Sequence, residues 1–144
     1  MEQDFREIVI TGATGGLGSD VIAQLQRFAP ASELGVSVRA PSKVAALSTA
    51  GIRVRRGDFN EPTSLDHAFE GARRVLLIST RTPANVARFQ EQRNAIDAAM
   101  RCGVEHIFYT SIVQRPGSLF AVAAGHHATE GYLASSGAGY TVLR

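Results

Sequence analysis

The segment Thr11–Gly18 (TGATGGLG) carries three evenly spaced glycines between a β-branched run and an amphipathic pattern. In such a context Gly12 permits a tight turn, Gly15 lets the backbone approach a pyrophosphate, and Gly18 lets a helix pack close to a sheet. The first helical turn offers free N–H groups and the positive dipole end to phosphate. The segment predicts a dinucleotide site, with a purely structural turn as the alternative. The predicted binding residues are Gly12, Thr14, Gly15, Gly16, Leu17 and Gly18.

Basic residues follow the second expected strand, where the ribose of a bound dinucleotide would lie. NAD binders usually place Asp or Glu about 20 residues after the glycine turn, whereas NADP binders place an arginine near the 2′-phosphate. The stretch 35–43 contains Arg39 and Lys43 and no carboxylate. Because a guanidinium can bind a phosphate dianion through two parallel hydrogen bonds, the stretch predicts NADP(H) in preference to NAD(H). The alternative for Arg39 is a solvated residue at a strand end.

Two further loops carry candidate cofactor-binding residues. Asp58 and Phe59 follow the third expected strand, where the edge and face of adenine would be contacted. Ser79, Thr80 and Arg81 follow the fourth, at the switch point beneath the pyrophosphate and the nicotinamide ribose. Each of these five is also an ordinary loop residue, and that reading stays open.

Short β-branched runs alternate with helical patterns along the chain, and these elements must position the candidate residues. Strands are expected at 6–11, 34–39, 52–57, 75–79, 104–110 and 140–143. Helices are expected at 17–28, 42–47, 62–71, 83–103 and 126–135, with a loop at 114–125. The alternation predicts the α/β class: one doubly wound parallel sheet of Rossmann type in three layers (α/β/α), with strand order 3-2-1-4-5-6. Residues 1–144 are expected to form one NAD(P)-binding domain.

Apolar spacing assigns an inward face to two of the expected helices. Leu17, Val21, Leu25 and Phe28 recur at spacings of four, four and three, which is one face of a helix. The longest helix is expected to bury a stripe of four apolar residues. They are Val86, Phe89, Ile96 and Met100.

Composition excludes several classes of protein. The chain has 144 residues, 44% of them hydrophobic, which is enough for a single core and excludes wholesale disorder. The net charge is only +2 and the arginines are scattered, so no nucleic-acid partner is expected. The single cysteine suits a reducing compartment, and neither a signal peptide nor a run of 18 apolar residues is present. We therefore expect a cytoplasmic protein without a membrane partner or a metal.

Five stretches together resemble the NmrA-like branch of the atypical short-chain dehydrogenases, close to its NAD(P)H-dependent quinone oxidoreductases and triphenylmethane reductases. They are ITGATGGLG (10–18), VR (38–39), GDFNEPTSLDHAFEG (57–71), LLIST with QEQRNAIDAAMRCGVEHIFYTS (around 76–111), and HHATEGYLASSGAGYTVLR (126–144). The first is shared by the whole superfamily, whereas the last is more particular to this branch. The resemblance implies a Rossmann domain that binds NADP(H) and delivers hydride to a small, planar, electron-poor acceptor such as a quinone.

The Tyr-x-x-x-Lys pair usual in short-chain dehydrogenases cannot exist here, because Lys43 is the only lysine and follows no tyrosine at that spacing. In the matching segment His126 and Glu130 stand four residues apart, on one face of a helix. This candidate catalytic pair could hold an imidazolium that protonates a reduced product. Alternatively, His126 and His127 are polar residues at a helix start, Glu130 is a surface acid, and the cofactor supplies the chemistry.

The family continues past its sixth strand with elements that build the substrate cleft, whereas this sequence stops at Arg144. We therefore expect a cofactor domain without the substrate-binding part. An edge strand at 140–143 would present unpaired backbone groups, and the cleft would expose apolar surface. The sequence thus predicts self-association through this edge or the cleft, as a two-fold homodimer.

Two functions compete at this stage. The first is an NADP(H)-binding oxidoreductase domain that transfers hydride to a quinone-like or other small planar acceptor. The alternative is a non-catalytic, NmrA-like sensor of dinucleotide redox state that acts through a protein partner, and loss of the Tyr/Lys pair fits both. A sugar-nucleotide epimerase ranks third, since that chemistry needs the missing tyrosine.

Overall fold

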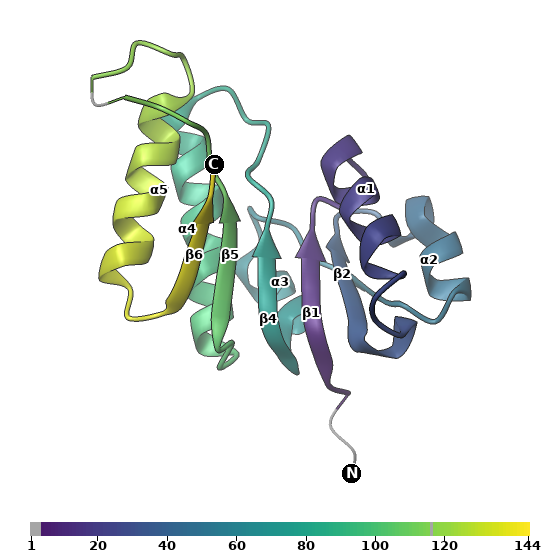
Figure 1. Cartoon of the computed structure of the whole chain (residues 1–144). Coiled ribbons are helices and arrows are strands. Elements are labelled where there is room, and N and C mark those ends of the chain that lie inside the picture. The colour runs from purple at the N-terminus through teal and green to yellow at the C-terminus, as the bar shows by residue number, and fades with distance from the viewer. Residues whose placement is uncertain (1–3, 116) are drawn as a thin grey trace.

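The computed structural model describes residues 4–115 and 117–144, and within them six parallel strands form one sheet (Figure 1). The strand order is β3-β2-β1-β4-β5-β6, which confirms the predicted Rossmann topology. The strands are β1 (Arg6–Thr11), β2 (Leu34–Val38), β3 (Arg53–Arg56), β4 (Ala72–Leu77), β5 (His106–Thr110) and β6 (Gly139–Leu143). The helices are α1 (Gly16–Leu25), α2 (Ala45–Thr49), α3 (Pro62–Phe69), α4 (Asn85–Arg101) and α5 (Ala123–Ser135), with 3-10 turns at Ala31–Glu33 and Pro41–Val44.

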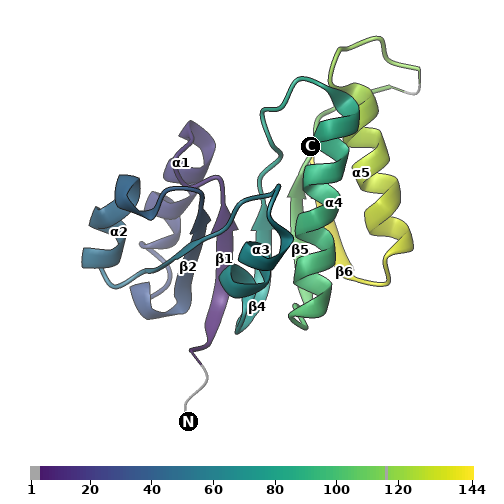
Figure 2. The ribbon, with the colours of Figure 1, turned by 180° about the vertical axis from the view of Figure 1, so that it is seen from behind.

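Helices cover both faces of the sheet. α1 and α2 lie on the face seen in Figure 1, and α3, α4 and α5 pack together on the face seen in Figure 2. Because successive side chains of a strand point to opposite faces, Val9 enters the core beneath α3–α5 and Ile10 the core beneath α1 and α2. Both side chains are fully buried. The predicted three-layer α/β/α arrangement is therefore confirmed.

The sheet reverses its order between β1 and β4, and a buried threonine joins the two strands there. The hydroxyl of Thr11 donates to the carbonyl of Leu76 (3.3 Å) and accepts the N–H of Ile78 (2.9 Å). In a doubly wound sheet the loops after the two central strands diverge at this point and leave a crevice at the carboxyl ends. The fold thus places the candidate residues after β1 and β4 on opposite sides of one crevice.

Several local expectations were wrong. α1 ends at Leu25, so Phe28 falls in the following turn and is 82% exposed, and Leu17 at the start of the helix is 54% exposed. On α4, Ile96 is fully buried as predicted, but Val86 is 84% exposed and Met100 39% exposed. Val86 lies two residues before the buried Arg88 and therefore on the opposite side of the helix. α5 begins at Ala123, three residues before the predicted start. Positions 1–3 of the predicted domain and position 116 of the predicted loop lie outside the described residues.

Within the described ranges, no helix combines the length and the apolar character needed to cross a bilayer.

Candidate functional site

The glycine turn packs β1 directly against α1, and two of its glycines are required by that packing. Gly12 has a φ of +69°, a conformation that residues with a side chain rarely adopt. A Cβ atom at Gly18 would lie only 2.6 Å from the carbonyl carbon of Gly12. The N–H of Gly15 donates to the carbonyl of Gly12 at 3.0 Å and closes the turn. Gly12 and Gly18 thus have the roles predicted from their spacing.

The other two glycines face open space. A Cβ atom at Gly15 would meet only the carbonyl oxygen of Gly12, at 3.4 Å, and one at Gly16 would meet nothing within 4 Å. Gly15 is the N-cap of α1 with an extended backbone, no side chain caps the helix, and its first turn carries no acid. The exposed side chains of Thr14 and Leu17 flank this end. A phosphate could therefore approach the N–H groups of the first turn without steric or electrostatic opposition.

Arg39 and Lys43 lie at the same edge of the sheet as the glycine turn. Thr11 is aligned with Ser37 in the β1–β2 register, so Arg39 leaves β2 just beyond the start of the turn. Lys43 stands in the 3-10 turn Pro41–Val44. Both side chains are exposed, and neither forms an ion pair with any other residue that the structure describes. Their charges are available to an anion beside the glycine turn.

Asp58 and Phe59 follow β3 and are held by contacts of their own. The N–H of Asp58 donates to the hydroxyl of Ser64 at 2.8 Å, and its carboxylate accepts the N–H of Asn60 at 2.9 Å. Phe59 is half-buried against the core beneath α3–α5, and its carbonyl accepts a hydrogen bond from Asn94 at 2.8 Å. These bonds are those of an ordered loop, and contact with adenine remains a prediction.

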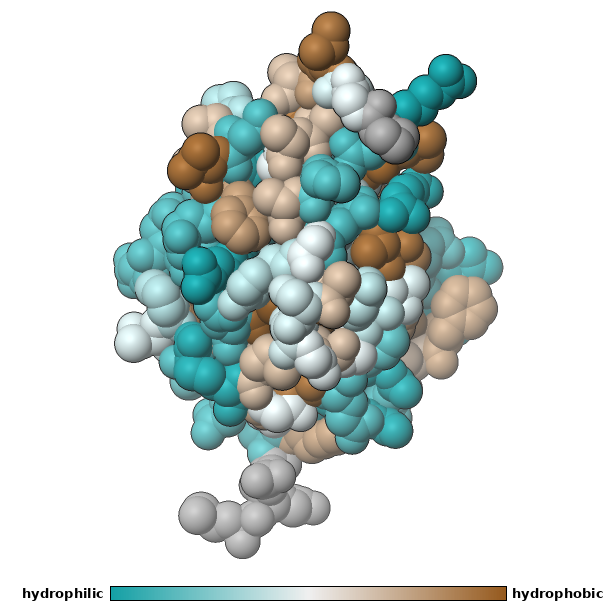
Figure 3. Space-filling model, turned by 90° about the vertical axis from the view of Figure 1, so that its left-hand side faces the viewer, coloured by the Kyte–Doolittle hydropathy of each residue, from teal (hydrophilic) through white to brown (hydrophobic). Residues whose placement is uncertain are grey.

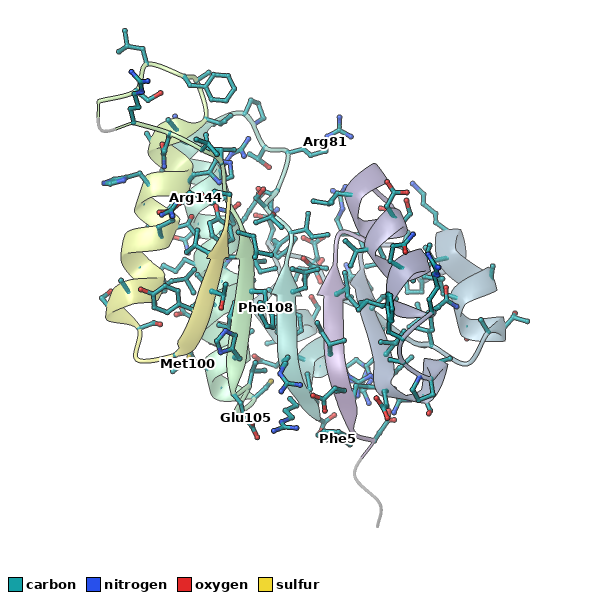
Figure 4. All side chains as sticks on the ribbon, in the orientation of Figure 1. Phe5, Arg81, Met100, Glu105, Phe108 and Arg144 are labelled. Carbon is teal, nitrogen blue, oxygen red and sulfur yellow. The ribbon has the colours of Figure 1, made fainter. Side chains whose placement is uncertain are left out.

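The loop after β4 carries Ser79, Thr80 and Arg81 on the other side of the crevice. The N–H of Ser79 donates to the Thr110 hydroxyl at 2.9 Å, and that of Thr80 donates to the Gln92 side chain at 3.1 Å. The Thr80 hydroxyl is buried and has no hydrogen-bond partner among the described residues. Arg81 is exposed and projects over the end of the sheet on the side of α1 (Figure 4). The loop thus offers a ligand the exposed guanidinium of Arg81, which forms no ion pair with another described residue.

His126 and Glu130 both lie on α5, but the structure gives them different partners. The His126 side chain is 2% exposed, so the view of it as a polar residue at a helix start is wrong. Its Nδ1 lies 2.7 Å from the Tyr109 hydroxyl and its Nε2 lies 3.4 Å from Arg88. Burial and the adjacent guanidinium lower the pKa of His126 below 6.5. Both effects oppose protonation of His126 to the predicted imidazolium.

Glu130 bonds to residues at the end of β5 and β6. Its carboxylate accepts the Ser111 hydroxyl and, at 2.7 Å, the guanidinium of Arg144. Partial burial raises the pKa of Glu130, but the two hydrogen bonds and the charge of Arg144 outweigh that effect, so its pKa is lowered. Glu130 is therefore a carboxylate at neutral pH. No hydrogen bond joins it to His126 within the described part of the chain.

Sequence reasoning missed a set of buried polar side chains behind the β4–α4 loop. Arg88 and Gln92 on α4 are buried, and they contact Tyr109 of β5 and His126 and Thr129 of α5. They were missed because the inward face of α4 was expected to be apolar. Their spacing was a usable signal, because Arg88 and Gln92 lie at i and i+4, in phase with the buried residues of the next two turns.

The sequence matches the model of a family described as NAD(P)H-binding over residues 12–144. Quinone oxidoreductase 2 of Escherichia coli is 42% identical over 95% of this chain and 47% of its own length. An NmrA-like family domain-containing oxidoreductase of Aspergillus flavus is 33% identical over 94% of this chain and 46% of its own. The chain thus spans about half the length of these relatives.

Solved structures agree with the sequence relatives. The Citrobacter sp. triphenylmethane reductase in complex with NADP(H) superposes with a TM-score of 0.92 at 38% identity, over 96% of this chain and 48% of the reductase. The resemblance to the NmrA-like quinone and triphenylmethane reductases is confirmed, and so is the Rossmann fold. With a family match that covers nearly the whole chain, the chain belongs to the NAD(P)H-binding family.

Proposed function

We propose that this chain is the cofactor domain of an NADP(H)-dependent oxidoreductase that reduces a quinone-like or other small planar acceptor. The observation that carries the proposal is the glycine turn, in which Gly15 and Gly16 leave open space before an uncapped helix start. A pyrophosphate is the ligand that such a turn accommodates best, because its negative charge meets free N–H groups and the positive end of the dipole.

The residues that would hold each part of the cofactor follow from their positions around the crevice. The first turn of α1 would bind the pyrophosphate, and Arg39 with Lys43 would bind the 2′-phosphate that distinguishes NADP(H) from NAD(H). The loop after β4 would contact the nicotinamide ribose, where the Thr80 hydroxyl lacks a partner. This assignment makes the protein prefer NADP(H), in line with the NADP(H) complex of the triphenylmethane reductase and an NADPH complex of the Escherichia coli quinone oxidoreductase.

Bound NADPH supplies a hydride, and with one proton this converts a quinone to a hydroquinone and leaves NADP⁺. Neither member of the predicted pair carries a spare proton at neutral pH, because Glu130 is a carboxylate and His126 is held neutral. We therefore assign the proton to solvent water and the positioning of the cofactor to the protein.

The nature of the acceptor is supported by exposed apolar residues in a loop at the carboxyl ends of the strands. The loop between β5 and α5 presents Val113, Leu119 and Phe120, of which Leu119 is 99% exposed. Apolar side chains are visible at this end of the molecule in the space-filling view (Figure 3). A planar apolar molecule would lose less solvation there than a polar one. Two relatives are named for quinones and for triphenylmethane dyes, which are small conjugated molecules with large apolar surfaces.

The test is to mix the protein with NADPH and a benzoquinone and to follow the absorbance of the reduced nicotinamide. We expect steady loss of NADPH above the rate without protein. Tight NADPH binding with no turnover would contradict the reductase and favour the dinucleotide sensor, whereas absence of binding would contradict both.

A further inference from the structure

A buried hydrogen-bond network connects the β4–α4 loop to α5 through one side chain. The carboxamide oxygen of Gln92 accepts the N–H of Thr80 at 3.1 Å. Its amide nitrogen donates to the hydroxyls of Tyr109 (3.1 Å) and Thr129 (2.6 Å). Gln92, Tyr109 and Thr129 are all fully buried. Among the described residues, the only backbone group hydrogen-bonded to this carboxamide is the N–H of Thr80, in the loop at the crevice.

The chemistry of the neighbours fixes the direction of these bonds. The backbone N–H of Thr80 can only donate, so the Gln92 atom that faces it is the carboxamide oxygen. The Tyr109 oxygen accepts from the amide nitrogen of Gln92, and the same hydroxyl is hydrogen-bonded to Nδ1 of His126. Thr129 donates its own proton to the carbonyl of Gly125 at 2.8 Å and so also accepts from Gln92. The hydroxyl oxygens of Tyr109 and Thr129 both accept hydrogen bonds from the amide nitrogen of Gln92. The carboxamide oxygen of Gln92 therefore faces Thr80.

A second side chain of α4 holds the same loop two residues further on. Nε of Arg88 donates to the carbonyl of Thr82 at 2.9 Å, while the same guanidinium contacts His126. The loop is thus tied at Thr80 and at Thr82 by residues one helical turn apart. Thr80, with its unpartnered hydroxyl, and Arg81, which projects over the crevice, lie in the segment so held.

We propose that Gln92 is a positioning residue, which fixes residues 80–82 in the shape that directs Arg81 toward a bound dinucleotide. The inference rests on the proposed function for the identity of the ligand. A network that served only to fill the core could be apolar at similar or lower cost. In this network, by contrast, the carboxamide oxygen of Gln92 accepts the backbone N–H of Thr80 in the β4–α4 loop.

The test compares three variants of the chain. Gln92→Leu keeps the approximate volume but removes the acceptor for Thr80, whereas Thr129→Val removes another member of the network and leaves that acceptor in place. Arg53→Met is the matched control, because Arg53 is also buried but bonds to the carbonyls of Ala68 and Glu70 at the opposite end of the strands. For each variant, hydrogen–deuterium exchange of peptides is measured without ligand, together with the dissociation constant for NADPH and the unfolding midpoint.

For Gln92→Leu we expect exchange in residues 79–82 to accelerate relative to β4, and the NADPH dissociation constant to rise about tenfold, which is about 1.4 kcal/mol. Thr129→Val should leave both unchanged. Arg53→Met should lower the unfolding midpoint without either effect. If Gln92→Leu lowers only the midpoint, as Arg53→Met does, the inference is wrong. A wild type that binds no NADPH refutes the proposed function and the inference together, whereas NADPH binding insensitive to Gln92→Leu refutes the inference alone.

Discussion

Substituting valine for Gly15 should abolish dinucleotide binding without unfolding the protein. The backbone of Gly15 has φ −87° and ψ 168°, a conformation that valine adopts readily. The first added atom would meet nothing closer than the Gly12 carbonyl oxygen at 3.4 Å, so the folded chain accepts it. The branched side chain then occupies the space through which a pyrophosphate must reach the N–H groups of α1.

The magnitude follows from the bonds that would be lost. A hydrogen bond to a charged group contributes about 1.5–3 kcal/mol, and a displaced pyrophosphate would lose at least two of them. The expected loss of affinity is therefore at least about a hundredfold. The cost in stability should stay near 1 kcal/mol, the usual size of an N-cap effect.

The assay is an NADPH titration paired with thermal unfolding of each variant. Gly131→Val is the matched control, since a Cβ atom at Gly131 meets nothing within 4 Å and the residue lies on α5. Gly18→Ala is the opposite case, because its Cβ atom would overlap the Gly12 backbone and should destabilise the fold itself. Unchanged NADPH affinity in a folded Gly15→Val protein would refute the phosphate-binding role of the turn.

Three other outcomes are expected. Arg39→Asp should reduce the preference for NADPH over NADH about ten- to a hundredfold, because it removes one charge-assisted hydrogen bond. The surface control Arg27→Asp should leave the preference unchanged, and equal binding of both cofactors by wild type and Arg39→Asp would contradict the assignment. Because the pKa of His126 is lowered below 6.5, the unfolded state binds more protons than the folded state under that pH. The free energy of unfolding should therefore fall as the pH drops through 6.5, and it should fall less steeply in the His126→Asn variant. Identical pH profiles of unfolding free energy for wild type and variant would contradict this role of His126. Finally, β6 lies at the edge of the sheet with its apolar residues partly exposed, so light scattering should report a homodimer, and a single-chain mass over a tenfold range of concentration would contradict the expectation.

Strand order and layers were predictable from the sequence because they depend on local signals that add up. Short apolar strands, glycine and proline boundaries and right-handed crossovers leave few arrangements for six parallel strands. The glycine turn was predictable for the same reason, since Gly12 and Gly18 are required by backbone geometry alone. Element ends were less predictable: α5 begins at Ala123, where the sequence has no strong capping residue.

The buried network could not be read from hydrophobicity. Gln92 and Arg88 are polar, and polar residues on a long helix are usually solvated, but here each finds partners on other elements. Those partners, on β5, α5 and the β4–α4 loop, are distant in sequence and become neighbours only in the fold. His126 was singled out for its chemistry, yet its burial depends on Tyr109 and Arg88, which no local pattern connects to it.

The most direct test of the account is a crystal structure of the protein with NADPH. We predict the pyrophosphate against the N–H groups that follow Gly15, the 2′-phosphate within hydrogen-bonding distance of Arg39, and the nicotinamide ribose beside Thr80. A dinucleotide bound elsewhere on the chain, or bound at the crevice with its 2′-phosphate facing solvent, would contradict the central claim.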